Sequence, residues 1–311
     1  MSYISDWIEK RKAGIATNAS AAITTIFGDA IKPHGGSIAQ TALVKLTGAL
    51  GISEATTRSA VFRLSTDGYL ESERFGRRSD YYLAKSMGQR ADQCMYRIYL
   101  PRHREWAGDW EVIIIDSNGL ETVELAQMGS DFASDGYGRV SLNVFIRPRR
   151  DPNPYCRIEE LVPEKHSERA AAMIARSARE VPFLKHKNFV ASLWRLPELN
   201  IDYERFTQDY SELMEQLMSV SNISPVDAFV IRQCMIHEYR HLVMVSPSLP
   251  VEYETENKPF DEARYIVREL YDQLVEKSEG FIASVIETAQ IAHPPLRMSF
   301  YQRFDGLTPS G

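Results

Sequence analysis

Two histidines, His237 and His241, are four residues apart, the spacing at which side chains share one face of a helix, and Glu238 lies between them. This is the H-E-x-x-H pattern, in which two imidazoles hold zinc and the glutamate acts as general base. A catalytic zinc site also needs a third protein ligand. The acidic residues downstream follow a proline-broken segment, SPSLPVEYETENKP, and not a second helix. We therefore expect no metal here, and a zinc-dependent hydrolase is the alternative function.

The sequence carries no other motif of catalysis. It has no glycine-rich phosphate loop and no G-x-S-x-G nucleophile elbow. Its three cysteines, Cys94, Cys156 and Cys234, are scattered and lack the spacing of a metal clip. No apolar run approaches the ~20 residues of a membrane span, and the first residues lack the apolar stretch of a secretion signal. We expect a cytoplasmic, non-enzymatic protein without cofactor or membrane contact.

Another set of residues has the chemistry that reads a DNA duplex. Short hydroxyls and forked guanidiniums reach base edges and phosphates in a major groove, and residues 53–63 supply several of each. A second basic cluster surrounds Gly76, where arginines would meet phosphates or a minor groove. The residues predicted to contact an operator in double-stranded DNA are Lys45, Ser53, Thr56, Thr57, Arg58, Arg63, Arg74, Arg77, Arg78 and Ser79.

These side chains need elements that present them together, and the local sequence predicts such elements. Leucines recur at helical spacing in residues 41–50, and Gly51 ends that helix. Ser53 then caps a second helix, which is expected to expose its hydroxyls and arginines. Apolar and aromatic residues flank the polar tip around Gly76, as in a β-hairpin. Helix, tight turn, helix and basic hairpin predict a winged helix-turn-helix in residues 1–90.

Two other interpretations of this segment stay open. Helix-turn-helix patterns also arise in small helical bundles, and a winged helix can serve as a scaffold for protein contacts. The distribution of charged residues along the chain slightly favours the DNA-binding interpretation. Residues 1–90 hold 12 Lys and Arg against 8 Asp and Glu, whereas residues 91–311 hold 24 against 34. A basic first part on an acidic remainder suits a DNA-reading module attached to a regulatory body.

The remaining chain divides into an α/β segment and a helical segment. The β-branched runs at 110–116 and 140–146 predict strands, and residues 167–179 predict a helix. These pieces suggest a ferredoxin-like (Cas2-like) middle domain, and amphipathic stretches after it predict a helical C-terminal domain. The whole is therefore expected to be an α+β multidomain protein. The expected boundaries are 1–90, 91–185, 186–295 and a tail at 296–311.

With these motifs identified, the chain resembles the PaaX-type transcriptional repressors, regulators of phenylacetic acid degradation. The resemblance covers nearly the whole chain and is strongest in residues 20–85. Its motifs are Phe27-Gly28-Asp29, Gly35-Gly36, Gly51-Ile52, Asp67-Gly68-Tyr69-Leu70, Gly76-Arg77-Arg78-Ser79, Arg97-Ile98-Tyr99 and His237-Glu238-Tyr239-Arg240. The acidic residues 119–139 depart from the basic helix that the family more often has there. Because the HEYR segment is itself a family motif, the zinc-like pattern is expected to be accidental.

The resemblance implies a homodimeric repressor of an aromatic (phenylacetate-type) catabolic operon. It also implies release from DNA by an aryl-acetyl-CoA effector, typically phenylacetyl-CoA. Such a CoA thioester needs cations for its phosphates and an apolar wall for its aryl group. The candidates for these contacts are Arg147, Arg149, Arg150, Trp194, Arg195, His237 and Arg240. A solvated loop is the other explanation of the arginines at 147–150.

Overall fold

A computed structural model describes residues 3–99, 108–149, 161–162, 166–176, 187–220, 222–247, 249, 259–288, 291 and 294–307. It combines helices with two antiparallel sheets and has a helical C-terminal region, which confirms the α+β class. The chain forms two compact units. The first comprises Met1–Leu100, Phe206–Arg240 and Glu262–Gly311, and the second comprises Pro101–Arg205 and His241–Asp261. The domain boundaries expected from the sequence stay a prediction.

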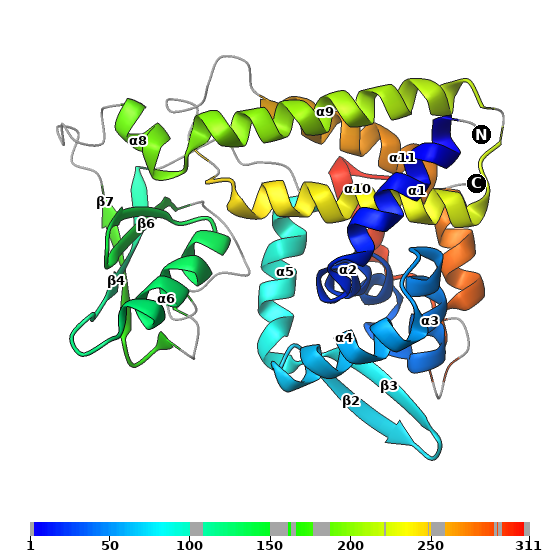
Figure 1. The fold of residues 1–311 in the computed structure, drawn as a ribbon, viewed down its shortest axis with the longest axis horizontal. Helices are drawn as coiled ribbons and strands as arrows, with labels where there is room; N and C mark the ends of the chain where they lie inside the picture. The colour runs from blue at the N-terminus through cyan, green and yellow to red at the C-terminus, as the bar shows by residue number, and fades with distance from the viewer. Residues whose placement is uncertain are drawn as a thin grey trace. The chain divides into compact units, whose positions relative to one another are not determined.

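The N-terminal segment of the first unit is mostly helical (Figure 1). Its elements are α1 (Tyr3–Ala16), α2 (Ala19–Ile26), a π-helical turn (Phe27–Ile31), a 3-10 turn (Lys32–His34), β1 (Ser37–Ala39), α3 (Gln40–Ala49), α4 (Glu54–Thr66), β2 (Leu70–Phe75), β3 (Arg78–Leu83) and α5 (Lys85–Tyr99). Local signals fix where these elements begin. The Asn18 side chain, for example, accepts a hydrogen bond from the backbone N–H of Ala21 at 3.2 Å and so caps α2.

A small antiparallel sheet with the strand order β1-β3-β2 belongs to this segment. β2 and β3 form a hairpin in which Leu70 lies opposite Leu83 and Phe75 lies opposite Arg78. Gly76 opens the turn with a φ of 63°, a left-handed conformation that side-chain-bearing residues rarely adopt. Leu70 is buried and the next four residues of β2 are exposed, so the hairpin extends from the core into solvent (Figure 1).

Helices from the C-terminal half complete the first unit. They are α9 (Leu196–Met218), α10 (Pro225–Val245), α11 (Pro259–Val285) and a 3-10 segment (Met298–Asp305), and the division between the units runs through the first three. Ser224 caps α10, because its Oγ accepts a hydrogen bond from the Asp227 backbone N–H at 3.1 Å. Tyr210, Phe229 and Tyr271 are fully buried and supply much of the core. No helix within the described residues is both long enough and apolar enough to span a bilayer.

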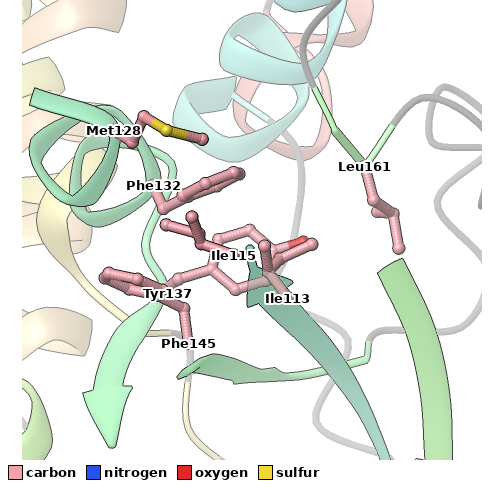
Figure 2. Close-up of a cluster of buried hydrophobic side chains, with 7 residues drawn as sticks. All are labelled: Ile113, Ile115, Met128, Phe132, Tyr137, Phe145 and Leu161. Carbon is pink, nitrogen blue, oxygen red and sulfur yellow. The ribbon is translucent and has the colours of Figure 1, made fainter. Parts of the chain in front are cut away.

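The second unit is built around a four-stranded antiparallel sheet in the order β5-β6-β4-β7. Its elements are β4 (Asp109–Ile115), α6 (Thr122–Ser134), β5 (Gly138–Ser141), β6 (Val144–Pro148), β7 (Ala170–Arg176) and α8 (Lys187–Leu193). α6 lies against one face of the sheet, where Met128 and Phe132 pack on Ile113, Ile115 and Phe145 (Figure 2). This cluster is the core of the unit, and its burial stabilises the sheet–helix pair.

The strand β7 corrects one prediction. Residues 167–179 were expected to form a helix because alanine, methionine and arginine favour helices. Residues 170–176 instead pair with β4 along their whole length, from Asp109 opposite Arg176 to Ile115 opposite Ala170. The long-range pairing outweighs the local preference, because intrinsic propensities are small compared with what a sheet position gains from packing and hydrogen bonds.

Candidate nucleic-acid interface

Two packed helices, α3 and α4, carry half of the ten residues predicted to contact DNA. Leu43 and Leu46 of α3 and Val61 of α4 are buried in the core of the first unit. Between the two helices, the hydroxyls of Thr47 and Thr57 are 2.8 Å apart and hydrogen bonded. Thr57 is only 1% exposed, so its side chain belongs to the helix packing. The expectation that Thr57 faces DNA is therefore corrected.

The turn before α4 sets the direction in which that helix starts. Gly51 has a φ of 78°, in the left-handed region, which lets the chain reverse after α3. The Ser53 Oγ accepts a hydrogen bond from the Thr56 backbone N–H at 3.1 Å and lies 2.8 Å from the Thr56 hydroxyl. Ser53 and Thr56 are both exposed, so the capped N-terminus of α4 faces solvent. A helix start of this kind attracts anions through its free N–H groups and its dipole.

The solvent face of α4 carries a ridge that sequence reasoning missed. At about 100° per residue, the positions directly opposite the buried stripe are Ala55, Ser59, Phe62 and Thr66. All four are exposed. The two predicted arginines flank this ridge: Arg58 on one side, where it pairs with Glu54 at 2.5 Å, and Arg63 on the other. Plotting the buried stripe on a helical wheel would have revealed the ridge.

The tip of the β2–β3 hairpin is cationic, while its stem is acidic. Arg77 and Arg78 are exposed at the tip, and the Arg74 Nε donates to the Gly76 carbonyl at 3.0 Å. Ser79 is half-buried. Closer to the core, Glu73 lies opposite Asp80 in the register. Phosphates are therefore attracted to the tip and repelled from the stem.

The structure places all six predicted cations of this segment at the surface. They are Lys45 on α3, Arg58 and Arg63 on α4, and Arg74, Arg77 and Arg78 on the hairpin. In Figure 1 α4 lies alongside the base of the hairpin, and the two elements are in contact. Six exposed positive charges on adjoining elements form a surface suited to a polyanion.

A buried polar network fixes the N-terminal segment to the C-terminal helices of the first unit. Its centre is Asp29, a fully buried residue of the π-helical turn. The Asp29 carboxylate accepts hydrogen bonds from Arg232 Nε at 2.7 Å, Gln233 Nε2 at 2.6 Å and Arg303 Nη1 at 2.9 Å. It also accepts bonds from the hydroxyls of two tyrosines. They are Tyr99 at 2.6 Å and Tyr271 at 3.0 Å.

A second carboxylate, Glu279, extends this network towards the sheet. It accepts a hydrogen bond from Arg232 and lies 2.8 Å from the Nε2 of His34, the residue three positions before β1. Burial opposes ionisation of both carboxyls, but the neighbouring guanidiniums have the larger effect. Arg232 and Arg303 hold the pKa of Asp29 below its ordinary value. Arg232 likewise holds the pKa of Glu279 below its ordinary value. The charged groups are thus mutually compensated inside the core.

Five of the effector candidates lie in the second unit, where Arg195 pairs with Glu198 at 3.2 Å and two others have internal partners. The Arg147 Nε donates to Glu111 at 2.6 Å, and its Nη1 donates to the Asp135 carbonyl at 2.6 Å. Trp194 is 8% exposed, and its Nε1 donates to the Gly136 carbonyl at 3.0 Å. Both are therefore committed to internal contacts, which corrects their expected role. Arg149 is half-buried and Arg195 is exposed, and Arg150 lies outside the described residues.

The other two candidates, His237 and Arg240, lie on α10 within the first unit. The His237 Nδ1 is 3.1 Å from the Thr25 hydroxyl, and the Arg240 Nη2 donates to the Ala21 carbonyl at 3.4 Å. Both residues face α2. Their polar atoms thus make contacts within the first unit.

The same part of α10 does not favour the zinc hydrolase. Glu238, the required general base, pairs with the Arg11 guanidinium at 3.2 Å. Among the described residues, no group of three or more His, Cys, Asp or Glu side chains is close enough to hold a metal ion. His237 lies beside the Thr25 hydroxyl, whereas His241 is exposed.

Two segments of the chain match one protein family. Residues 18–87 match the PaaX-like protein family, and residues 194–284 match the PaaX-like protein C-terminal domain. The chain belongs to the PaaX-like family. The first PaaX-like segment runs from α2 to the start of α5 and contains Asp29. The second contains three of the residues that donate hydrogen bonds to Asp29, namely Arg232, Gln233 and Tyr271.

A curated PaaX-like relative aligns over nearly the whole chain. It is the transcriptional repressor PaaX of Escherichia coli strain K12, 26% identical over 315 residues, with 99% of this chain and 96% of the relative covered. Among solved structures, an uncharacterised protein, Rv0674, from Mycobacterium tuberculosis is 22% identical. The match covers 78% of this chain and 89% of that protein, with a TM-score of 0.46.

Proposed function

We propose that this chain is a DNA-binding transcriptional repressor. The observation that carries the proposal is the set of six exposed cations on α3, α4 and the β2–β3 hairpin. Lysine and arginine on adjoining elements supply the sequence-independent attraction to phosphates, and the exposed face of α4 supplies groups that can read bases. The PaaX-like relative is named a transcriptional repressor, which supports the same assignment.

The proposal includes a fold assignment for each unit. α3, the turn, α4 and the hairpin together act as a winged helix-turn-helix, with α4 in the major groove and the hairpin tip at the backbone. The sheet of the second unit has the order β7-β4-β6-β5, so its strands run fourth, first, third, second in chain order. With α6 between the first two strands, this order supports a ferredoxin-like middle domain.

The hairpin tip gives a direct test of DNA binding. The Arg77→Ala/Arg78→Ala variant should bind a random-sequence duplex more weakly and with a salt slope smaller by roughly 2, because each phosphate contact contributes about 0.9 to that slope. Fluorescence anisotropy against salt concentration measures both quantities. Arg169→Ala/Arg205→Ala is the matched control, since it removes two exposed arginines from the second unit and should leave the slope unchanged. A wild-type chain that binds no duplex would overturn the proposal and leave a protein-contact scaffold.

We also propose that an aryl-acetyl-CoA, such as phenylacetyl-CoA, releases the chain from an operator of a phenylacetate-type operon. The family resemblance supports this effector. Arg149, Arg195, His237 and Arg240 stay as candidate contacts, together with Arg150. The same anisotropy assay, repeated with phenylacetyl-CoA, with free phenylacetate and with CoA, tests the effector. Release by the thioester alone is expected, and release by free phenylacetate alone would contradict it.

A homodimer is part of this proposal. Two copies of α4 would read half-sites one helical turn apart or a multiple of it. Footprinting of a selected duplex would then give two protected segments whose centres are about 10 base pairs, or a multiple of about 10, apart.

A further inference from the structure

The exposed ridge of α4 contains one residue that a solvated helix face does not explain. Phe62 is 72% exposed, and it is the only exposed phenylalanine among the described residues. Single exposed apolar residues are common on protein surfaces. Phe62, however, lies in the middle of the face that points directly away from the core, on a helix whose remaining exposed residues are nearly all polar.

The surroundings of Phe62 indicate what the ring meets. Arg58, Ser59, Phe62 and Arg63 adjoin one another on an open part of the α4 surface. The aromatic ring is thus flanked by two guanidiniums and a hydroxyl. A protein partner with an acidic rim, or DNA, would complement this charge, and the basic tip of the hairpin in the same unit favours DNA.

We propose that Phe62 is a specificity-determining residue that packs on the 5-methyl group of a thymine in the major groove. The inference rests on the proposed function, since it requires α4 to lie in that groove. Thymine presents the only apolar group on the major-groove edge of the four bases, and phenylalanine is one of the side chains that contact it. Arg58 and Arg63 on either side would donate to guanines or phosphates next to that thymine.

Removing the 5-methyl group of a single thymine tests this contact separately from the rest of the interface. The probe is the duplex that the full-length wild-type chain enriches from a pool with a randomised central segment. Each thymine of that duplex is then replaced in turn by deoxyuracil, which lacks only the methyl group. At one thymine per half-site we expect the wild-type affinity to fall by about fourfold, the factor for burying one methyl-sized apolar group. At the other thymines the replacement should have little effect.

Variants of the protein, measured on the same duplexes, show whether Phe62 makes this contact. Phe62→Ala should bind the thymine and deoxyuracil duplexes equally, while Phe62→Leu, which keeps an apolar side chain, should retain part of the difference. Val123→Ala is the matched control, because Val123 is 77% exposed on α6 of the second unit and should preserve the full fourfold effect. The thermal midpoint of Phe62→Ala should equal that of the wild type, since an exposed ring contributes little to the core.

The outcomes separate this inference from the function on which it rests. If the wild type enriches no duplex, the proposed function fails and the inference fails with it. If the wild type binds DNA but every deoxyuracil duplex binds as well as the parent, DNA binding stands and the thymine contact is overturned. A deoxyuracil effect that persists in Phe62→Ala, with a loss of self-association in sedimentation, would overturn it too and place Phe62 between two copies of the chain.

Discussion

Thr56 and Thr57 are adjacent threonines with opposite environments. Thr56 is exposed at the start of α4, whereas Thr57 is buried and hydrogen bonded to Thr47. The Thr47 hydroxyl donates to the Leu43 carbonyl at 3.0 Å, so the Thr57 hydroxyl is the donor between the two threonines. One residue along a helix turns the side chain by about 100°, which is enough to move it from solvent into the core.

This difference predicts the effect of Thr57→Val. The variant keeps the shape of the side chain and removes one buried hydrogen bond, so the free energy of unfolding should fall by about 0.5–1.5 kcal/mol. DNA affinity of the folded protein should stay unchanged. Urea unfolding and anisotropy, measured on the same preparation, check the two quantities. A tenfold loss of affinity at unchanged stability would return Thr57 to the DNA-contacting face.

At the scale of the element, the start of α4 can both cap the helix and attract a phosphate, and substitutions can separate the two effects. Ser53 caps the helix, and the same N-terminus has the free N–H groups and the dipole that attract a phosphate. Replacement by aspartate keeps a side-chain acceptor for the cap and favours the helix dipole. The same carboxylate repels phosphate. Replacing Ser53 by aspartate should therefore keep the stability of the protein and weaken DNA binding, whereas replacing it by alanine should lower the stability.

We expect Ser53→Ala to lower the free energy of unfolding by about 0.5–2 kcal/mol, the usual cost of losing a cap. Ser53→Asp should restore that stability and yet bind DNA more weakly than Ser53→Ala, with the gap narrowing at high salt. Thermal melts and anisotropy at two salt concentrations give the comparison. Equal DNA affinity for the two variants would mean that the α4 N-terminus lies away from phosphates.

The elements themselves were largely predictable from the sequence, because their signals are local. Gly51, Ser53 and Gly76 each mark a boundary through the backbone conformation or hydrogen bond of that residue alone. Thr57 was misplaced and the ridge at Phe62 was missed because the face on which a residue of α4 lies depends on its angle to the buried stripe, at about 100° per residue, and not on its residue type. β7 was missed because its strand conformation comes from its partner β4 and not from its own composition.

At the scale of the whole molecule, the network around Asp29 was beyond sequence reasoning. Phe27-Gly28-Asp29 was recognised as a family motif, but nothing local indicates that Asp29 pairs with Arg232, 203 positions away, or with Arg303, 274 positions away. Removing one partner of a buried ion pair leaves the other charge uncompensated. Stability of the first unit therefore depends on all three of its segments.

The network predicts how stability changes with pH. The pKa values of Asp29 and Glu279 are lowered in the folded chain, so their contribution is fully present above the ordinary carboxyl pKa of about 4 and is lost as the pH falls through the folded values. Asp29→Asn should lower the free energy of unfolding by about 3–5 kcal/mol at pH 7 and flatten its decline below pH 4. Urea titrations from pH 7 to pH 3 test this, with the exposed Glu54→Gln as control. A urea midpoint of the wild type that stays constant down to pH 3 would contradict this pH dependence.

The separation of Asp29 from Arg303 also bears on how the chain is made. During translation the turn with Asp29 leaves the ribosome 274 residues before the arginine that neutralises it. At about 5–20 residues per second, that interval lasts roughly 15–55 s. The nascent N-terminal segment must wait in an incomplete state until the final helical turns emerge, so premature termination near the end of the message would release a chain whose first hundred residues lack part of their own core.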